Sequence, residues 1–190
     1  MTKVYPKGEA VEKASTSATT ELTVWKKSLL FNCNGFTVFD PKGDLIFRVD
    51  NYMEGHRGQT LLMDAAGKPL LTIRRKRKLS LGDCWVVCDG ETTSNPLFSM
   101  RKNVSVLNSK SLAYASKKGR AVLYEVEGSY GKRCCTVYDG KRRKMAEVRS
   151  KEAAGGVNLG YDVFRLIVHP GLDTATAMSL VILLDQMFRS

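Results

Sequence analysis

Two clusters of basic residues are the features of this 190-residue sequence with the clearest capacity for chemistry. Five consecutive cations, Arg74-Arg-Lys-Arg-Lys78, directly follow the apolar segment Leu70 to Ile73. Guanidinium groups hold phosphate through paired hydrogen bonds, and lysine adds a compact point charge. A second cluster, Lys141-Arg-Arg-Lys144, occupies a predicted hairpin turn. The candidate phosphate ligands are therefore Arg74, Arg75, Lys76, Arg77, Lys78, Lys141, Arg142, Arg143 and Lys144.

The net charge of the chain is +11 at pH 7, and its isoelectric point is about 9.5. The excess is local, because residues 65–78 contain six basic and no acidic side chains, and residues 117–150 contain ten basic and four acidic ones. A local excess of this kind favours an acidic partner, which is nucleic acid, an anionic membrane surface or an acidic protein. The alternative, a solvated loop that binds no ligand, stays open for both clusters.

Signatures of catalysis are missing from the sequence. It contains no G-x-S-x-G elbow, no phosphate-binding P-loop and no H-E-x-x-H motif. His56 has no identifiable catalytic partner, and His169, which precedes Pro170, is expected to serve turn or core packing. Asp185 is expected to be buried with a hydrogen-bond partner. We therefore predict a protein that is not an enzyme and has no cofactor.

The cysteines indicate neither a disulfide framework nor a metal site. Their odd number and the absence of an export signal favour reduced thiols in the cytosol or nucleus. Within one predicted strand, Cys84 and Cys88 are too far apart to pair. Neither histidine lies at a finger-like spacing from any cysteine. The cysteines are Cys33, Cys84, Cys88, Cys134 and Cys135, the last two adjacent and so expected on opposite faces of a strand.

Short apolar or alternating segments separated by turn residues dominate the chain from Leu22 to His169. Phe36-Thr-Val-Phe39, the turn Asp40-Pro-Lys-Gly43 and Leu45-Ile-Phe-Arg-Val49 predict a β-hairpin. Similar patterns recur over residues 61–73, 84–100 and 135–148, too irregularly for a true repeat array. With the remaining segments the count reaches about twelve antiparallel strands, and closing them into a barrel would remove exposed edges.

One helix is predicted at the C-terminus, over about 174–188. Asp173 is placed to cap it, after the strand-breaking segment His169-Pro-Gly171. The helix is apolar almost all round, so it must be buried. At about 15 residues it is too short for a bilayer, and it contains Asp185. We predict that it fills the barrel, which strand side chains alone would not fill.

The chain is expected to form one domain over residues 22–190, preceded by a poorly ordered N-terminal arm over residues 1–21. The arm is rich in Ser, Thr, Lys and Glu and has no apolar core of a signal peptide. No apolar stretch reaches the roughly 18 residues of a membrane-spanning helix. Within the domain, strand alternation through Arg75 and Arg77 would bury two guanidinium groups, so the basic run is expected to leave the barrel at its rim.

Three segments resemble the plant LURP-one-related family: Phe36 to Val49, Gly82-Asp-Cys-Trp-Val-Val87 and Ser179-Leu-Val-Ile-Leu-Leu-Asp185. The resemblance covers about Leu22 to Phe188. It implies a tubby-like fold, a twelve-stranded barrel around a hydrophobic C-terminal helix, in agreement with the patterns above. Other members of that fold group, tubby domains and phospholipid scramblases, act at membranes, and tubby domains bind phosphoinositide headgroups. Some LURP-one-related proteins are associated with plant defence.

We therefore expect a cytoplasmic binding module, at a membrane periphery or in the nucleus, whose basic rim binds anionic phospholipid headgroups or a membrane surface, in plant defence signalling. Two alternatives stay open. The same cations suit a nucleic-acid-binding or nuclear regulatory protein, although the run Arg74 to Lys78 contains no aromatic residue for base stacking. A protein-interaction scaffold, in which the charge serves solubility, is the other. The oligomeric state does not follow from the sequence.

Overall fold

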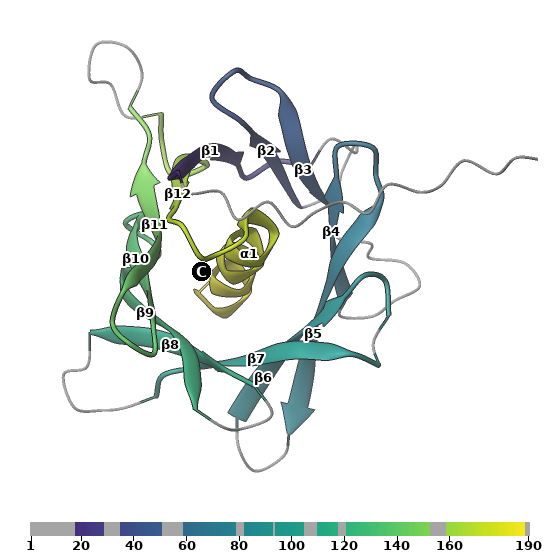
Figure 1. The fold of residues 1–190 in the computed structure, drawn as a ribbon, viewed down its shortest axis with the longest axis vertical. Coiled ribbons are helices and arrows are strands. Elements are labelled where there is room, and N and C mark those ends of the chain that lie inside the picture. The colour runs from purple at the N-terminus through teal and green to yellow at the C-terminus, as the bar shows by residue number, and fades with distance from the viewer. Residues whose placement is uncertain are drawn as a thin grey trace, which may run out of the picture.

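The computed structural model of the protein describes residues 18–28, 35–50, 59–78, 82–92, 94–104, 110–117, 121–152 and 159–188. Within them the chain forms a closed antiparallel barrel of twelve strands around one helix (Figure 1). The predicted fold class is confirmed. The elements are β1 (Thr20–Trp25), β2 (Gly35–Phe39), β3 (Leu45–Asp50), β4 (Gln59–Asp64), β5 (Pro69–Lys78), β6 (Gly82–Asp89), β7 (Pro96–Lys102), β8 (Ser111–Ser116), β9 (Val122–Ser129), β10 (Cys134–Asp139), β11 (Lys144–Ser150), β12 (Val163–Val168) and α1 (Thr174–Phe188).

Each strand pairs with its neighbours in sequence, and β1 pairs with β12 to close the barrel. The closing strand begins earlier than the sequence indicated. Thr20 and Glu21, which the expected arm included, pair with Val168 and Ile167 in register. These two residues belong to the domain because pairing with β12 satisfies their backbone groups. Of the rest of the expected arm, Ala18 and Thr19 are described, and residues 1–17 lie outside the described residues.

A shared turn chemistry explains why the hairpin pattern recurs in the sequence. In the β2–β3 turn, Oδ1 of Asp40 accepts hydrogen bonds from the N–H groups of Lys42 (2.8 Å) and Asp44 (2.9 Å). Asp139 does the same in the β10–β11 turn, and Asp64 accepts one from Lys68 in the β4–β5 turn. An aspartate that bonds the following backbone replaces missing ladder bonds, which fixes a tight reversal. Each of these turns also has one residue at positive φ: Gly43, Gly67 and Arg142.

Helix α1 occupies the interior of the barrel, and its N-terminus is capped as predicted. The N–H of Thr176 donates to Oδ1 of Asp173 over 2.8 Å. Ten of its residues are buried on all sides of the helix: Ala177, Met178, Ser179, Leu180, Val181, Ile182, Leu183, Leu184, Asp185 and Met187. Inward strand side chains such as Val24, Met100 and Leu166 surround it in one continuous core. None of the helices in the described residues is long and apolar enough to cross a membrane.

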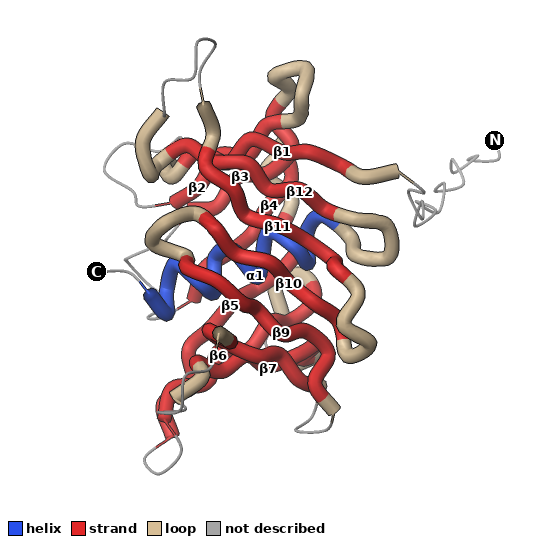
Figure 2. The backbone as a smooth tube through the Cα atoms, turned by 90° about the vertical axis from the view of Figure 1, so that its left-hand side faces the viewer, coloured by secondary structure: helices blue, strands red, loops and turns tan. Residues whose placement is uncertain are grey.

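The two ends of the barrel differ. Because consecutive strands are neighbours, successive connections alternate between the ends. We call the end with the connections that follow β2, β4, β6, β8, β10 and β12 the turn end. The opposite end, with the connections that follow β1, β3, β5, β7, β9 and β11, is the mouth end. Helix α1 starts at the turn end and finishes at the mouth end, on the right and left of Figure 2, respectively.

Candidate functional site at the barrel mouth

The first basic cluster reaches the barrel rim as expected, but within a paired strand. Strand β5 continues through the run, with Arg74 opposite Val86, Arg75 opposite Trp85 and Lys76 opposite Cys84. This part of the run therefore lies in a strand and not in a loop. Alternation does turn Arg75 inward, yet its side chain remains 44% exposed because β5 and β6 extend beyond the core. The rim position avoids the cost of burying a guanidinium.

The guanidinium of Arg75 is held in place by two neighbours on β6. It forms an ion pair and hydrogen bond with Asp83, and it lies over the ring of Trp85, 5.4 Å from the ring centre. Trp85 itself is buried, with 4% exposure. The hydrogen bond that Arg75 donates to Asp83 raises the pKa of Arg75 above its ordinary value. Since a guanidinium has five N–H donors, the contact with Asp83 leaves donors for a ligand.

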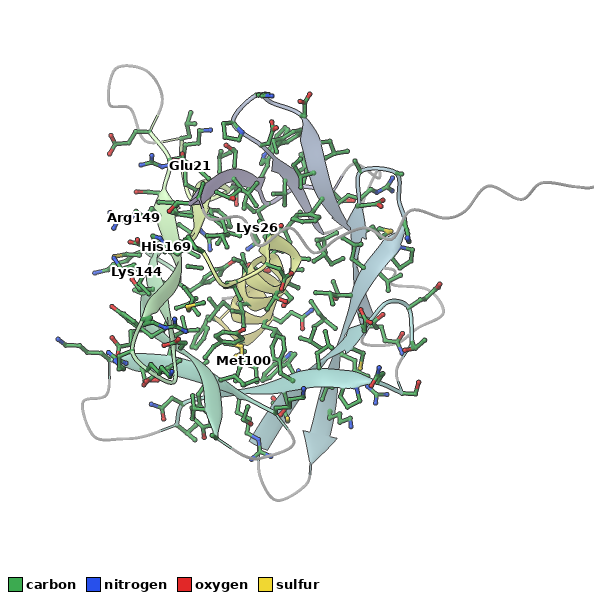
Figure 3. All side chains as sticks on the ribbon, in the orientation of Figure 1. Glu21, Lys26, Met100, Lys144, Arg149 and His169 are labelled. Atoms are coloured by element: carbon green, nitrogen blue, oxygen red, sulfur yellow. The ribbon has the colours of Figure 1, made fainter. Side chains whose placement is uncertain are left out.

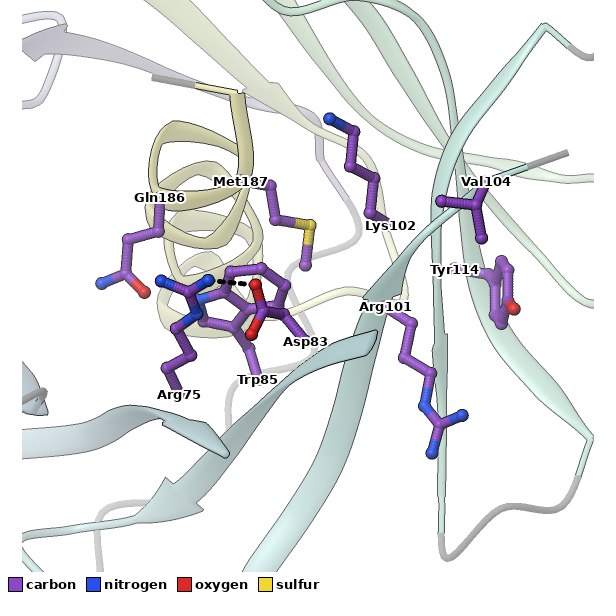
Figure 4. A pocket seen from close by; sticks show the side chains of 9 residues that line it. All are labelled: Arg75, Asp83, Trp85, Arg101, Lys102, Val104, Tyr114, Gln186 and Met187. Atoms are coloured by element: carbon purple, nitrogen blue, oxygen red, sulfur yellow. Dashed lines mark hydrogen bonds and ion pairs between the residues drawn. The ribbon is translucent and has the colours of Figure 1, made fainter. Parts of the chain in front are cut away.

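A cavity of about 310 Å³ lies beside Arg75, between the last turn of α1 and strands β5 to β8 (Figure 4). Arg75, Asp83, Trp85 and Lys102 line it from the strands, and Gln186 and Met187 line it from the helix. Its outer edge is formed by Arg101, Val104 and Tyr114. The arrangement provides three cations and one carboxylate around a small hollow, which suits an anionic group.

Arg101 and Lys102 are site residues that the sequence reasoning missed. They end β7, directly after the buried residue Met100. Lys102 continues the inward face and extends over the ring of Phe188 at 4.7 Å, and Arg101 lies opposite Tyr114 on the other face. The signal was present in the sequence, because Met100-Arg-Lys102 is a second apolar strand that ends in cations. Two cations are too few to form a noticeable charge run.

The second basic cluster does not belong to the same patch. It lies in the β10–β11 turn at the turn end, whereas Arg74 to Lys78 lie at the mouth end. Five strands, β6 to β10, lie between the two connections, and an odd number of antiparallel strands places them at opposite ends of the barrel. Most of its charges are also paired: Arg142 with Glu125 and Glu127 at 3.0 Å, Arg143 with Asp139 at 2.7 Å, and Lys144 with Glu147 at 3.2 Å. The nine candidates therefore lie in two separate places on the barrel.

Asp185 is buried at the mouth end with partners, as predicted. Nζ of Lys26, which follows β1, lies 2.8 Å from Oδ1 of Asp185, and the hydroxyl of Tyr130 donates to the same oxygen over 3.3 Å. Burial, and then the negative charge of Asp185, raise the pKa of Tyr130 far above its ordinary value. Figure 3 shows Lys26 directed toward the helix from the barrel wall. The cluster joins the helix to the β1–β2 and β9–β10 connections.

His169 lies in the turn that follows β12, one of its two expected roles, and not in the core; its carbonyl oxygen accepts from the N–H of Leu172 over 3.4 Å. Its Nε2 lies 3.1 Å from Oε1 of Glu147 on the outer wall, where Lys144 and Arg149 also contact this carboxylate (Figure 3). Burial alone would raise the pKa of Glu147. Hydrogen bonds from Arg149, His169 and Lys144 outweigh burial and lower that pKa to about 2. The cluster is a paired structural network, since the cations neutralise the carboxylate.

The described cysteines are thiols and not disulfides: Cys84, Cys88 and Cys135 are buried, and Cys134 is exposed. The adjacent pair Cys134 and Cys135 thus faces opposite sides, as predicted. Burial raises the pKa of Cys135 to about 12, which makes this thiol a poor nucleophile. No group of three His, Cys, Asp or Glu residues in the described ranges is arranged to hold a metal ion. Cys33 and His56 lie outside those ranges.

A twelve-stranded barrel filled by its C-terminal helix, with a basic mouth at one end, defines a helix-plugged β-barrel class of protein. The chain belongs to the LURP-one-related family, whose model matches residues 20–185. It is 56% identical to Protein LURP-one-related 8 of Arabidopsis thaliana over the full length of both chains. It is 42% identical to Protein LURP-one-related 17 of the same plant, over 90% of this chain and 84% of that one.

A solved structure supports the fold. The X-ray structure of an Arabidopsis thaliana protein superposes with a TM-score of 0.67 and 24% sequence identity, over 91% of this chain and 93% of that one. At this identity the likeness establishes the shared fold alone.

Proposed function

We propose that the protein is a non-enzymatic binding module whose mouth end engages anionic phospholipid headgroups at a membrane surface. The observation that carries the proposal is the cavity of about 310 Å³ between α1 and β5 to β8, which Arg75, Arg101 and Lys102 line and in which Asp83 is the only acidic residue among the described lining residues. A volume of this size is at the lower end of small-ligand pockets, roughly 300–1,000 Å³. A phosphorylated headgroup would therefore fit without rearrangement of the barrel.

The position of the cations supports recognition of phosphate rather than a diffuse charge effect. The contacts of Arg75 with Asp83 and Trp85 hold its guanidinium at the rim, which lowers the entropy lost on binding. Lys102 lies over Phe188 at 4.7 Å, so its ammonium group is also placed at the helix end. Preorganised donors around a hollow are how proteins select phosphate groups.

Nucleic acid is the competing ligand, and the same cations would contact its phosphates. The aromatic ring nearest to Arg75, that of Trp85, is only 4% exposed and lies beneath the guanidinium. It therefore offers no free face for stacking on a base, which sequence-tolerant binding of single strands uses. Beside Arg75 this favours phosphate contacts over base stacking; Tyr114, at the outer edge of the cavity, is 37% exposed, so the DNA-binding test below is needed to separate the two ligands.

Vesicle flotation with a matched pair of triple variants tests the proposal. We expect Arg75→Gln, Arg101→Gln and Lys102→Gln together to weaken binding to anionic vesicles about a hundredfold, since each surface cation contributes about 1 kcal/mol there. The control is Lys42→Gln, Lys68→Gln and Lys141→Gln, which removes the same charge from exposed positions at the turn end. It should bind vesicles within about twofold of the unmodified protein, by the same charge argument.

Three results would contradict the proposal. The first is equal loss of binding in both triple variants, and the second is no binding of the unmodified protein to any anionic vesicle. The third is steep, salt-dependent binding to duplex or single-stranded DNA in the absence of vesicle binding, which would assign the mouth to nucleic acid.

A further inference from the structure

Exposed apolar side chains gather at the same end of the barrel as the basic mouth. In the described ranges the large hydrophobic residues with high exposure are Trp25 (40%), Val104 (84%), Tyr114 (37%), Val122 (45%), Leu159 (44%) and Tyr161 (66%). Only Val122 lies at the turn end; Trp25, Val104, Leu159 and Tyr161 lie at strand ends or in connections of the mouth end, and Tyr114 lines its cavity. Exposed apolar groups confined to one surface usually mark an interaction site.

Two of these residues, Trp25 and Tyr161, lie at neighbouring strand ends on the side of the barrel away from the cavity. Trp25 ends β1 opposite Val163, the first residue of β12, and Tyr161 precedes that strand by two residues. The N–H of Lys26 donates to the carbonyl oxygen of Asp162 over 2.7 Å, which fixes the two segments side by side. The side chain of Lys27 lies over the ring of Trp25, 5.2 Å from its centre. An aromatic pair with an adjacent ammonium group results.

The same end also carries the local charge excess. Its strand ends and connections include the basic residues Lys26, Lys27, Arg75, Lys76, Arg101 and Lys102 and the acidic residues Asp50, Asp83, Glu152, Asp162 and Asp185. At the turn end, by contrast, acidic turn residues such as Asp40, Asp64 and Asp139 accompany the lysines and arginines. Trp, Tyr and Lys together are the side chains that suit the boundary between headgroups and acyl chains.

We infer that the protein docks end-on against an anionic bilayer, with Trp25 and Tyr161 inserted at the interface while the mouth cations contact headgroups. The inference rests on the proposed function for the electrostatic half of the contact. The apolar half is independent of it, because Trp25 and Tyr161 line no part of the mouth cavity. An anionic bilayer is the partner that matches both a positive field and exposed amphipathic rings on one end. The barrel axis then stands perpendicular to the membrane surface, and the turn end faces away from the membrane.

Tryptophan fluorescence with brominated lipids measures the insertion directly. The protein has two tryptophans, and only Trp25 is exposed, since Trp85 is buried. Bromine quenches a tryptophan only near contact, so vesicles of phosphatidylserine and brominated phosphatidylcholine should quench the emission of the unmodified protein. The variant Trp25→Phe should bind the same vesicles and lose most of this quenching. Unquenched emission from protein that is bound to vesicles would overturn the inference.

Affinity and salt dependence provide the second readout. We expect Tyr161→Ser, at a side chain that is 66% exposed, to weaken vesicle binding about tenfold at 500 mM NaCl, where charge contacts are screened and apolar insertion persists. The matched control is Val122→Ser, which removes an exposed apolar side chain from the turn end and should change nothing. Equal affinities for Tyr161→Ser and Val122→Ser would also overturn the inference.

The failures of the two proposals are distinguishable. If the unmodified protein is quenched by brominated vesicles but the mouth triple variant binds them unchanged, headgroup recognition fails and end-on docking stands. If the mouth variant loses vesicle binding and Trp25 of the bound unmodified protein is not quenched, headgroup recognition stands and end-on docking fails. Quenching of Trp25 by single-stranded DNA in place of vesicles would overturn both.

Discussion

At the scale of single residues, the β10–β11 turn contains one of the two described non-glycine residues with a positive φ, the other being Arg133. Arg142 has φ +64°, whereas Gly43 and Gly67 occupy the corresponding positions of the β2–β3 and β4–β5 turns. A residue with a Cβ in the left-handed region costs roughly 1–2 kcal/mol. Arg142 offsets this cost with ion pairs to Glu125 and Glu127 at 3.0 Å and a guanidinium that lies over the ring of Tyr138. The sequence shows Gly140 in this turn, but only the structure shows that the left-handed residue is Arg142.

The pair of variants Arg142→Gly and Arg142→Ala separates backbone from side chain. Both remove the ion pairs, but only glycine removes the left-handed cost. We expect Arg142→Gly to have a free energy of unfolding about 1 kcal/mol higher than Arg142→Ala. Urea denaturation with an unchanged m-value measures the difference. Equal stabilities would mean that the turn relaxes to another conformation in the alanine variant.

Glu147 gives the fold a defined sensitivity to acid. Its pKa is lowered to about 2 in the folded protein, below the roughly 4.3 of an unfolded glutamate. A lowered folded-state pKa stabilises the fold above pH ~4.3 and ceases to do so as the pH falls toward 2. We expect Glu147→Gln to unfold about 1–3 kcal/mol more easily at pH 7, with a difference from the unmodified protein that disappears by pH ~2. Thermal unfolding across this pH range measures the effect, and a constant difference at all pH values would contradict it.

At the scale of elements, the sequence predicted strands and helix well because each carries a local signal. Asp-Pro-Lys-Gly43 specifies a reversal through bonds that Asp40 makes to the next few residues, so no distant contact is needed. The helix was identified because its sequence is apolar almost all round, with no sustained polar face. The start of β1 was misplaced by two residues, since Thr20 and Glu21 are strand residues only by virtue of pairing with β12. Such pairing joins the two ends of the chain and leaves no local signal.

The buried helix is the part of the core whose packing is easiest to test. Leu184 is fully buried, at 0% exposure, between α1 and the barrel wall. We expect Leu184→Ala to lower the free energy of unfolding by about 2–5 kcal/mol, because the barrel wall cannot close the resulting cavity. Gln186→Ala, two residues later, should cost less, about 1 kcal/mol, since it loses one hydrogen bond, to Oγ1 of Thr60 at 2.9 Å. Denaturant titration of both variants checks the order, and a larger loss for Gln186→Ala would contradict it.

At the scale of the whole molecule, the two basic clusters lie at opposite ends because an odd number of strands, β6 to β10, separates them along the chain. In an up-and-down barrel, alternate hairpins open at opposite ends, so the β5–β6 and β10–β11 connections lie apart. Net charge and local charge runs hide this, because both clusters look alike in the sequence. Arg74 to Lys78 could be found as candidates from composition, whereas the grouping of Arg75 with Arg101 and Lys102 depends on which strands surround the last turn of α1. Which strands surround the end of the helix is determined only when the barrel closes around it.

If charge acts locally, even large changes of charge at the turn end should leave vesicle binding unaltered. The variant Lys42→Glu, Lys68→Glu and Lys141→Glu lowers the net charge from +11 to +5, because each substitution removes two charges. The mouth triple variant to Gln lowers it only to +8. Helix α1 has 15 residues and so separates the two ends by about 22 Å, well beyond the Debye length of about 8 Å at 0.15 M salt. Screening should therefore confine each field to its own end.

We expect this triple glutamate variant, the turn-end reversal, to bind anionic vesicles with an affinity within about twofold of the unmodified protein at 150 mM NaCl. Its net charge nevertheless falls by twice as much as that of the mouth variant. At 10 mM NaCl, where the Debye length is about 30 Å, the same reversal should weaken binding measurably. Vesicle flotation at the two salt concentrations measures both effects. If the turn-end reversal instead weakened binding more than the mouth variant at 150 mM NaCl, total charge rather than its position would govern the interaction. The asymmetry between the two ends of the barrel would then have no role in binding.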